Sequence, residues 1–189
     1  MLNPSVQWWE YEDRYSCQEM IEGVYLGPST ILRDSNFLQD RKISNIVISR
    51  SEREKVFLKP REHPSLQITY HIIDIEDSPI SSCMSSFSKF LDLMNQLGPG
   101  AENPVLIVGM TGMNRSASLV GVYVMQKFLL PANRAIEYMI SRRRCVSISQ
   151  NVLRQMEEFS IAKRAAVVPI TRSLTESTNR KRPGELVQS

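Results

Sequence analysis

Residues 105–118, VLIVGMTGMNRSAS, combine residue types and a spacing that suit the binding of an anion. A continuous apolar run ends there in a loop with glycine and arginine, and a helical pattern follows the loop. A strand, a tight loop and a helix direct successive backbone N–H groups and the positive end of a helix dipole toward one point. Arg115 adds a planar guanidinium that can bind two phosphate oxygens at once. The sequence therefore predicts a phosphate-binding loop made of Gly109, Met110, Thr111, Gly112, Met113, Asn114, Arg115 and Ser116.

Two small residues of this loop have predicted roles. Gly112 permits a turn with positive φ and a close approach of the backbone to a ligand, and Ser116 could cap the following helix or donate to the loop. The loop lacks the Gly-Lys-Ser/Thr of nucleotide hydrolases and does not match the dinucleotide fingerprint G-x-G-x-x-G. The alternative interpretation is a plain turn that joins strand to helix, with Arg115 in solvent.

The loop offers no group that would attack phosphorus, because it contains no cysteine, histidine or lysine. Thr111 carries a hydroxyl, but no neighbouring base would activate it. The few cysteines are far apart in the sequence, which fits reduced thiols in a cytosolic or nuclear protein. They are Cys17, Cys83 and Cys145. With only His63 and His71 as histidines and no metal-type spacing, we expect no metal site and no cofactor.

The composition is that of a globular domain. The chain has 189 residues, 42% of them apolar and 23% charged, which suits one domain with a hydrophobic core. The net charge of +3 includes +2 from residues 171–189, so nothing favours binding to nucleic acid. No apolar run approaches the roughly 20 residues of a membrane-spanning helix, and the acidic first residues lack the apolar core of a secretory signal. We therefore expect no membrane segment and no leader.

Short strands alternate with helices along the chain. Branched and aromatic residues bounded by turn residues predict strands at 23–27, 45–49, 68–75 and 104–108. Apolar residues three and four apart predict helices over 87–97, from Pro131 to 140, and over 152–159; proline is tolerated at a first helical position. This order favours an α/β fold, with a mainly parallel sheet covered by helices on both faces and the apolar strand 105–108 at its centre.

Composition also predicts the limits of the domain. Residues 1–19 form an N-terminal extension whose Trp8 and Trp9 we expect to pack on the domain, and residues 20–166 form the domain itself. Residues 167–189 are rich in serine, threonine, charge and proline, which favours a disordered tail. Its NRKR segment is either a nuclear-import patch or a solvated basic stretch.

Residues 105–116 resemble the signature V-L-V-H-C-x-x-G-x-x-R-S of the cysteine-dependent dual-specificity phosphatases. EGVYLGPS (22–29), ITYHIIDIEDSP (68–79) and AIEYMISRRRC (135–145) are similar to further segments of that family. The resemblance covers residues 20–166 and implies the cysteine-phosphatase fold. It places Gly109 at the position of the nucleophilic cysteine, Val108 at that of a histidine, and Asp77 at that of the general acid.

Glycine in place of the cysteine, together with the RR-x-C pattern, resembles one pseudophosphatase subfamily, the serine/threonine/tyrosine-interacting proteins. The chain departs from its relatives at Val108, where that subfamily keeps histidine, and at VSISQN (146–151), where Pro-Asn is usual. Met110 and Met113 are bulkier than the loop residues of active members. The size of these two methionines predicts a wide or shallow pocket.

The resemblance implies binding without catalysis. Glycine at 109 removes the thiolate that would form a phospho-enzyme, but the backbone donors and Arg115 remain. Loss of the thiolate also removes a charge that would repel a phosphate dianion. In the opposite direction, glycine makes the empty loop less ordered, at a free-energy cost of about 0.5–1 kcal/mol. The implied partners are phosphorylated proteins, mitogen-activated protein kinases among them, and ubiquitin-ligase adaptors by resemblance alone. The implied role is to hold substrates or to compete with active phosphatases in the cytoplasm or nucleus.

Two alternatives to phosphoprotein binding remain open: a scaffold whose loop no longer binds phosphate, and an enzyme with residual activity. Asp77 is either a relic of a general acid or a carboxylate that caps a turn ahead of Pro79. The run Arg142, Arg143 and Arg144 either complements a helix dipole or contacts a phosphorylated partner.

Overall fold

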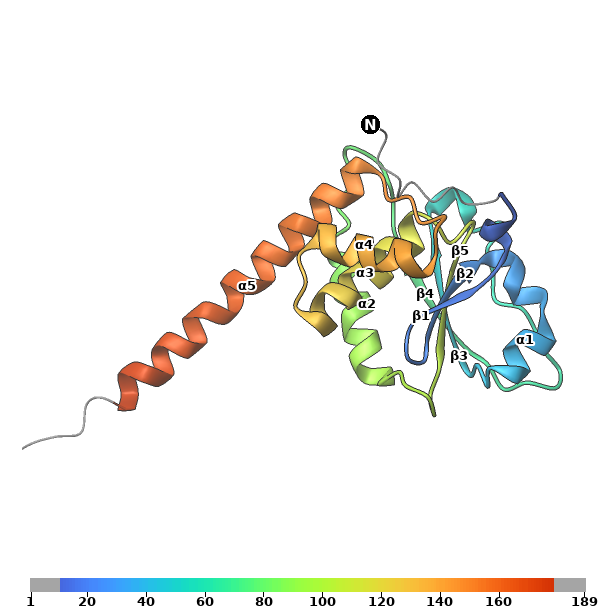
Figure 1. Ribbon diagram of the computed structural model, residues 1–189, viewed down its shortest axis with the longest axis horizontal. Helices are drawn as coiled ribbons and strands as arrows, with labels where there is room; N and C mark the ends of the chain where they lie inside the picture. Colours follow the sequence, from blue (N-terminus) through green and yellow to red (C-terminus); the bar gives the residue numbers. More distant parts are fainter. Residues whose placement is uncertain (1–10, 179–189) are drawn as a thin grey trace, which may run out of the picture.

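A five-stranded sheet forms the centre of the protein, with strand order β1-β2-β5-β3-β4 (Figure 1). The computed structural model describes the backbone of residues 11–178 and the side chains of residues 11–165. Strands β2, β5, β3 and β4 run parallel, and β1 pairs with β2 in the antiparallel sense. The strands are Gln18–Ile21 (β1), Val24–Pro28 (β2), Asn45–Arg50 (β3), Thr69–Asp74 (β4) and Val105–Gly109 (β5).

The four strands predicted from the sequence coincide with β2, β3, β4 and β5, and β5 is the central strand. The sequence analysis missed β1, which begins with the polar residues Gln18 and Glu19 and shows no apolar alternation. A tight turn at Gly23 joins β1 to β2. Gly23 has a φ of +71°, and a Cβ there would overlap the carbonyl of Gly100, so this position requires glycine.

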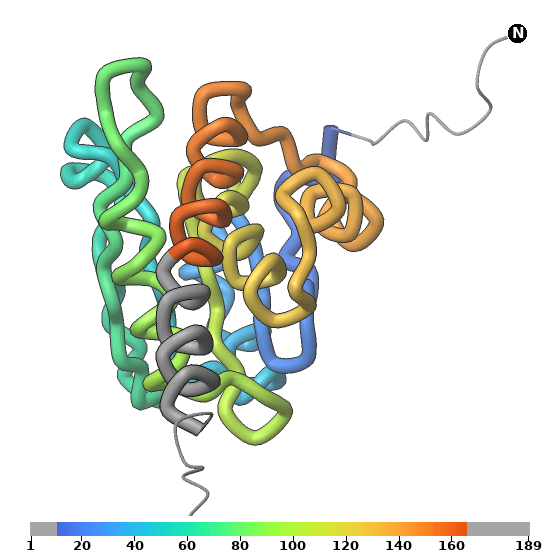
Figure 2. Tube along the Cα trace, turned by 90° about the vertical axis from the view of Figure 1, so that its left-hand side faces the viewer, coloured from blue at the N-terminus to red at the C-terminus, as the bar shows by residue number. Residues whose placement is uncertain are grey.

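Helices cover both faces of the sheet, which confirms the predicted α/β architecture (Figures 1 and 2). The larger layer lies on one face and packs through an apolar cluster that includes Val47 and Ile107. The smaller layer covers the other face through a cluster that includes Ile48 and Val108. The larger layer contains α2 (Met84–Leu97), α3 (Arg115–Phe128), α4 (Ala132–Arg142) and α5 (Gln150–Thr178), and the smaller one contains η2 (Ser29–Arg33) and α1 (Ser35–Asp40). Because alternate residues of β5 serve the two clusters, the whole strand is buried and apolar.

The helix ends agree with the sequence signals in part. Helix α2 stops at Gly98, which adopts the left-handed conformation at the predicted GPG boundary. Pro131 is the N-cap of α4 in extended conformation, so it precedes the first helical residue instead of occupying it as predicted. The backbone of α5 continues as a helix to Thr178, through part of the segment whose composition favoured a disordered tail.

Residues 1–10 and 179–189 lie outside the described residues, and with them Trp8, Trp9 and the NRKR segment. Their predicted roles and the predicted domain limits stay predictions. Between residues 11 and 178, none of the helices combines the length and the apolar character needed to cross a bilayer.

Candidate functional site

The predicted phosphate-binding residues surround one cavity at the carboxyl end of β5. The cavity has a volume of about 270 Å³ and is lined by residues 109–116 together with Ser49 and Asp77. In open parallel sheets, ligands bind in the crevice at the carboxyl ends of the strands. The structure therefore brings together all eight predicted loop residues and the predicted acid position.

Carbonyl groups of the loop point away from this cavity. Four consecutive carbonyls accept hydrogen bonds from groups that lie outside the loop, at 2.9–3.4 Å. These are Met110 O from Ser29 Oγ, Thr111 O from Arg143 Nη2, Gly112 O from Arg143 Nε and Met113 O from Ser147 N. In a trans peptide the N–H of the next residue points opposite to the carbonyl. The N–H groups of residues 111–114 consequently point inward and form a concave set of donors suited to an anion.

Arg143 holds the loop in this shape from outside the cavity. Its guanidinium, 1% exposed, donates to the carbonyls of Thr111 and Gly112 at 3.1 Å each and to that of Ser16 at 2.6 Å. Further hydrogen bonds reach the N-terminal segment through the carbonyls of Asp13 and Arg14 and through Gln18 Oε1. Burial lowers the pKa of this guanidinium, and the nearby Cys145, Cys17 and Asp13 oppose that shift.

The three arginines of this run differ in their roles. Arg143 neither complements the helix dipole nor reaches a partner, because α4 ends at Arg142 and Arg143 turns inward. Arg142 lies in the last turn of α4, where it does complement the dipole, and it also stacks over the ring of Tyr138. Arg144 is exposed.

Gly112 is required by its conformation and by its neighbours. It has a φ of +68°, as predicted. The close approach that it permits is to the end of β2, since a Cβ on Gly112 would lie 2.6 Å from the carbonyl carbon and oxygen of Gly27. The prediction assigned this space to a ligand; in the structure the backbone of Gly27 and Pro28 fills it.

Gly109 ends β5 at the floor of the cavity, and Ser116 occupies the space above it. A Cβ on Gly109 would lie 2.6 Å from Ser116 Oγ and 3.0 Å from Ser116 Cβ. Ser116 does not cap α3, because the N-cap position belongs to Asn114. The buried hydroxyl of Ser49 also lines the cavity and has no hydrogen-bond partner among residues 11–165. The floor therefore offers neutral hydroxyl groups and no thiolate.

Arg115 is ion-paired inside the protein and does not extend into solvent. Its Nη2 donates to Glu54 Oε1, and the two side chains are 24% and 14% exposed. Glu54 ends the short helix η3 (Glu52–Glu54), and its other oxygen accepts from Ser51 N at 2.8 Å. One such contact engages one of the five N–H donors of a guanidinium. The fork is therefore held in place and keeps donors for a ligand.

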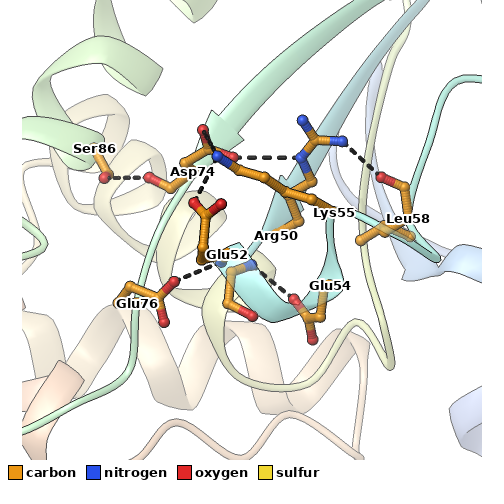
Figure 3. Close-up of polar contacts among 9 residues, drawn as sticks. Arg50, Glu52, Glu54, Lys55, Leu58, Asp74, Glu76 and Ser86 are labelled. Carbon is orange, nitrogen blue, oxygen red and sulfur yellow. Dashed lines mark hydrogen bonds and ion pairs between the residues drawn. The ribbon is translucent and has the colours of Figure 1, made fainter.

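The segment that carries Glu54 is itself tied down (Figure 3). Glu52 N donates to Glu76 Oε1 at 2.6 Å, and Lys55 Nζ pairs with Glu52 and, at 3.6 Å, with Asp74. Arg50 joins the same group through Asp74. Glu54 is thus a fixed counter-ion for Arg115.

Asp77 cross-links three segments beside the cavity. Its Oδ2 accepts from Asn114 Nδ2 at 2.6 Å, and its Oδ1 accepts from Ser149 Oγ at 2.9 Å and Asn151 Nδ2 at 3.4 Å. The predicted capping of its own turn is not observed; Ser78 Oγ accepts from Ile80 N there instead. Asp77 therefore ties the loop to the start of α5.

The segment 146–151, which stands where Pro-Asn is usual, supports the phosphate loop and contributes no residue to the lining of the cavity. Ser149 N donates to Asn114 Oδ1 at 3.1 Å, and Ser147 N donates to the loop at Met113. Sequence reasoning missed the contributions of Ser149, Glu54 and Arg143. Only Glu54 had a local signal, the S-x-x-E capping box of residues 51–54.

All three cysteines are free thiols, and none lines the cavity. Burial raises the pKa of Cys17 to about 12. Burial and the nearby Asp77 raise that of Cys83 to about 11. Burial also raises the pKa of Cys145. None of these thiols has the lowered pKa of a nucleophilic cysteine.

Comparison with known proteins places the chain among phosphatase-like proteins. The family "dual specificity phosphatase, catalytic domain" matches residues 24–162. The serine/threonine/tyrosine-interacting protein of Homo sapiens is 30% identical over 156 residues, which cover 80% of this chain and 67% of the human protein. Form B of that protein from Xenopus laevis is 31% identical over the same shares of the two chains.

A solved structure gives the same result. The crystal structure of human tyrosine phosphatase-like serine/threonine/tyrosine-interacting protein superposes with a TM-score of 0.68 and 28% identity, over 79% of this chain and 98% of that one. The resemblance to this subfamily and the fold that it implied are therefore confirmed.

Proposed function

Because the chain belongs to the dual-specificity phosphatase family, we propose that its 109–116 loop binds phosphorylated side chains without hydrolysing them. The observation that carries the proposal is the set of four outward carbonyls in residues 110–113, which directs the following N–H groups into the cavity. Arg115 adds a cationic fork at the edge of this set. Hydrogen bonds from these donors to a phosphate dianion are stronger than hydrogen bonds from them to a neutral acceptor.

Hydrolysis lacks a nucleophile. Gly109 has no side chain, and the three thiols lie outside the cavity, Cys17 half-buried and the other two buried, where burial raises the pKa of each. Asp77 already accepts three hydrogen bonds, and a general acid without a nucleophile has no reaction to assist. We therefore propose a pseudophosphatase.

The proposed partners are phosphorylated proteins in the cytoplasm or nucleus, with mitogen-activated protein kinases among them. The relatives are named for interaction with serine, threonine and tyrosine, and the cavity suits the phosphate that these residues can carry. A protein of this kind regulates signalling by sequestering a phosphorylated substrate or by competing with an active phosphatase. Ubiquitin-ligase adaptors are proposed as partners from the family resemblance alone.

The test is calorimetric titration of a phosphotyrosine peptide into the wild type, Arg115→Ala and Arg144→Ala. We expect saturable binding by the wild type and by Arg144→Ala, whose arginine is exposed and outside the cavity. Arg115→Ala should lose about tenfold or more, since a charge-assisted hydrogen bond contributes about 1.5–3 kcal/mol. Equal binding by all three proteins, or binding by none, would overturn the proposal. An aryl phosphate assayed alongside should show no hydrolysis.

One observation favours a second function, that of a scaffold whose loop stays empty. Glu54 already neutralises Arg115, and a carboxylate beside the fork disfavours a second anion. Arg115→Lys separates the two functions, because lysine keeps the charge but loses the bidentate fork. If Arg115→Lys captured partner proteins as well as the wild type did, and neither protein bound the phosphopeptide, the scaffold function would be established.

A further inference from the structure

Four exposed apolar side chains lie on the phosphate loop and on two loops that are hydrogen-bonded to it. Val56 and Phe57 follow η3, Ile80 follows Asp77, and Met110 belongs to the phosphate loop itself. They are 68%, 75%, 96% and 39% exposed, in that order. We call these four residues the apolar rim. Large apolar side chains that gather on an exposed surface indicate an interaction site.

Hydrogen bonds keep the first side of the apolar rim close to the cavity. Phe57 N donates to the carbonyl of Glu54 at 3.0 Å, in the turn that follows η3. The side chain of this same Glu54 is paired with Arg115. Val56 and Phe57 therefore lie two and three residues from Glu54, which pairs with the predicted phosphate-binding Arg115.

The part of the apolar rim at Ile80 is also constrained. Ile80 is three residues beyond Asp77, which accepts from Asn114 of the phosphate loop at 2.6 Å. Three residues span at most about 11 Å, and a turn from Ser81 N to Ser78 O shortens this span.

The two outer loops also contact each other. Glu52 N of the first donates to Glu76 Oε1 of the second at 2.6 Å (Figure 3). Figures 1 and 2 place both segments at the end of the sheet where β5 stops. The loops that carry the rim are therefore joined to each other and to the loop that lines the cavity.

We infer that the apolar rim and the cavity together bind a phosphorylated polypeptide segment with aliphatic or aromatic residues next to the phosphorylated residue. The inference rests on the proposed function, which places the phosphate among the inward N–H groups and Arg115. A free phosphate would occupy the cavity and leave the rim in water. A polypeptide continues on both sides of its phosphorylated residue at about 3.3–3.6 Å per residue, so residues one to three positions away reach Phe57 and Ile80.

The experiment compares two phosphotyrosine peptides of equal charge, one with leucine and phenylalanine at the three positions on each side, the other with serine there. Both are titrated into the wild type, Phe57→Ser, Ile80→Ser and Leu129→Ser, and inorganic phosphate is titrated into the wild type and Arg115→Ala. Leu129→Ser is the matched control, because Leu129 is 84% exposed but caps the far end of the 14-residue helix α3. At 1.5 Å per residue this end lies about 21 Å from the loop.

The wild type should prefer the apolar peptide by about tenfold or more, the effect of burying one large apolar side chain. Phe57→Ser and Ile80→Ser should each reduce this preference severalfold, and Leu129→Ser should keep it. Equal affinity for the two peptides, with Arg115-dependent binding of inorganic phosphate, would overturn the inference and leave the proposed function intact. Failure of inorganic phosphate and of both peptides to bind would overturn the proposed function, and the inference with it.

Discussion

Gly109→Ala tests whether the loop is built around the absence of a side chain. The added Cβ would lie 2.6 Å from Ser116 Oγ and 3.0 Å from Ser116 Cβ. Rotation of the hydroxyl relieves the first contact, but the second requires the buried first turn of α3 to shift. The φ of Gly109 is outside the left-handed region, so alanine introduces no backbone strain.

Two effects of opposite sign decide the result. Alanine in an allowed conformation stabilises by about 0.4–1 kcal/mol through the unfolded state, whereas an extra methyl group in a packed site costs about 1–3 kcal/mol. Because Ser116 Cβ cannot rotate away, we expect the steric effect to win and Gly109→Ala to destabilise by about 1 kcal/mol. In a Ser116→Gly background both contacts disappear, and the same substitution should stabilise by about 0.4–1 kcal/mol.

The assay is urea denaturation of the four proteins of this double-mutant cycle. The effect that Ser116→Gly alone has on helix α3 cancels in the cycle. The coupling free energy therefore isolates the contact between positions 109 and 116. A coupling of about 1.5 kcal/mol is expected. Additivity within about 0.5 kcal/mol would refute the reasoning, because Ser116 would then not occupy the space of a side chain at 109.

Four further predictions follow from the same geometry. Gly109→Cys alone should give no measurable hydrolysis of an aryl phosphate in a continuous absorbance assay, because Val108 replaces the histidine of the family signature and Asp77 already accepts three hydrogen bonds. Arg143→Ala should lower the free energy of unfolding in urea by about 3 kcal/mol or more, since several buried carbonyls lose a donor at about 1–3 kcal/mol each, whereas the exposed Arg144→Ala should change it by less than about 0.5 kcal/mol. Fewer than three thiols should react with Ellman's reagent at pH 8 in the native state, and all three should react in denaturant. Burial raises the pKa of Cys17 to about 12 and that of Cys83 to about 11, above their ordinary 9.0. The free energy of unfolding that these protonated thiols contribute is therefore complete below pH 9 and is lost as the pH rises toward those pKa values. Asp77→Asn should destabilise by about 1–2 kcal/mol in urea, because Asn114 and Ser149 lose a charged acceptor; an unchanged midpoint would contradict the cross-linking role.

Local patterns in the sequence account for most of the fold. The strands β2, β3, β4 and β5 carry branched residues between turn residues, and burial of β5 on both faces produces the apolar run that precedes the loop. The polar β1 has no such pattern, because its place in the sheet depends on pairing with β2. Periodicity reports which face of an element is buried, and it says nothing about a strand held mainly by its partner.

The sequence likewise predicts only part of the loop: its own residues, but not the residues that support it. Gly112 and Arg115 are recognisable because their residue types are the ones that predict a phosphate-binding loop. Their supports are distant: Glu54 is 61 residues from Arg115, and Arg143 is 31 residues from Gly112. A glutamate in a capping box and an arginine at a helix end each have a sufficient local explanation, so nothing in the sequence points from either one to the loop.

The buried Arg143 also bears on why the loop keeps its shape. Burying a guanidinium costs free energy that an apolar residue at the same place would not cost, and burial here lowers its pKa. Arg143 fixes the carbonyls of Thr111 and Gly112 outward, and this orientation is what turns the following N–H groups inward. The support acts on the backbone from outside the cavity and does not depend on the side chain at position 109. Glycine at 109 is therefore compatible with the inward orientation of these N–H groups, on which the proposed phosphate binding depends.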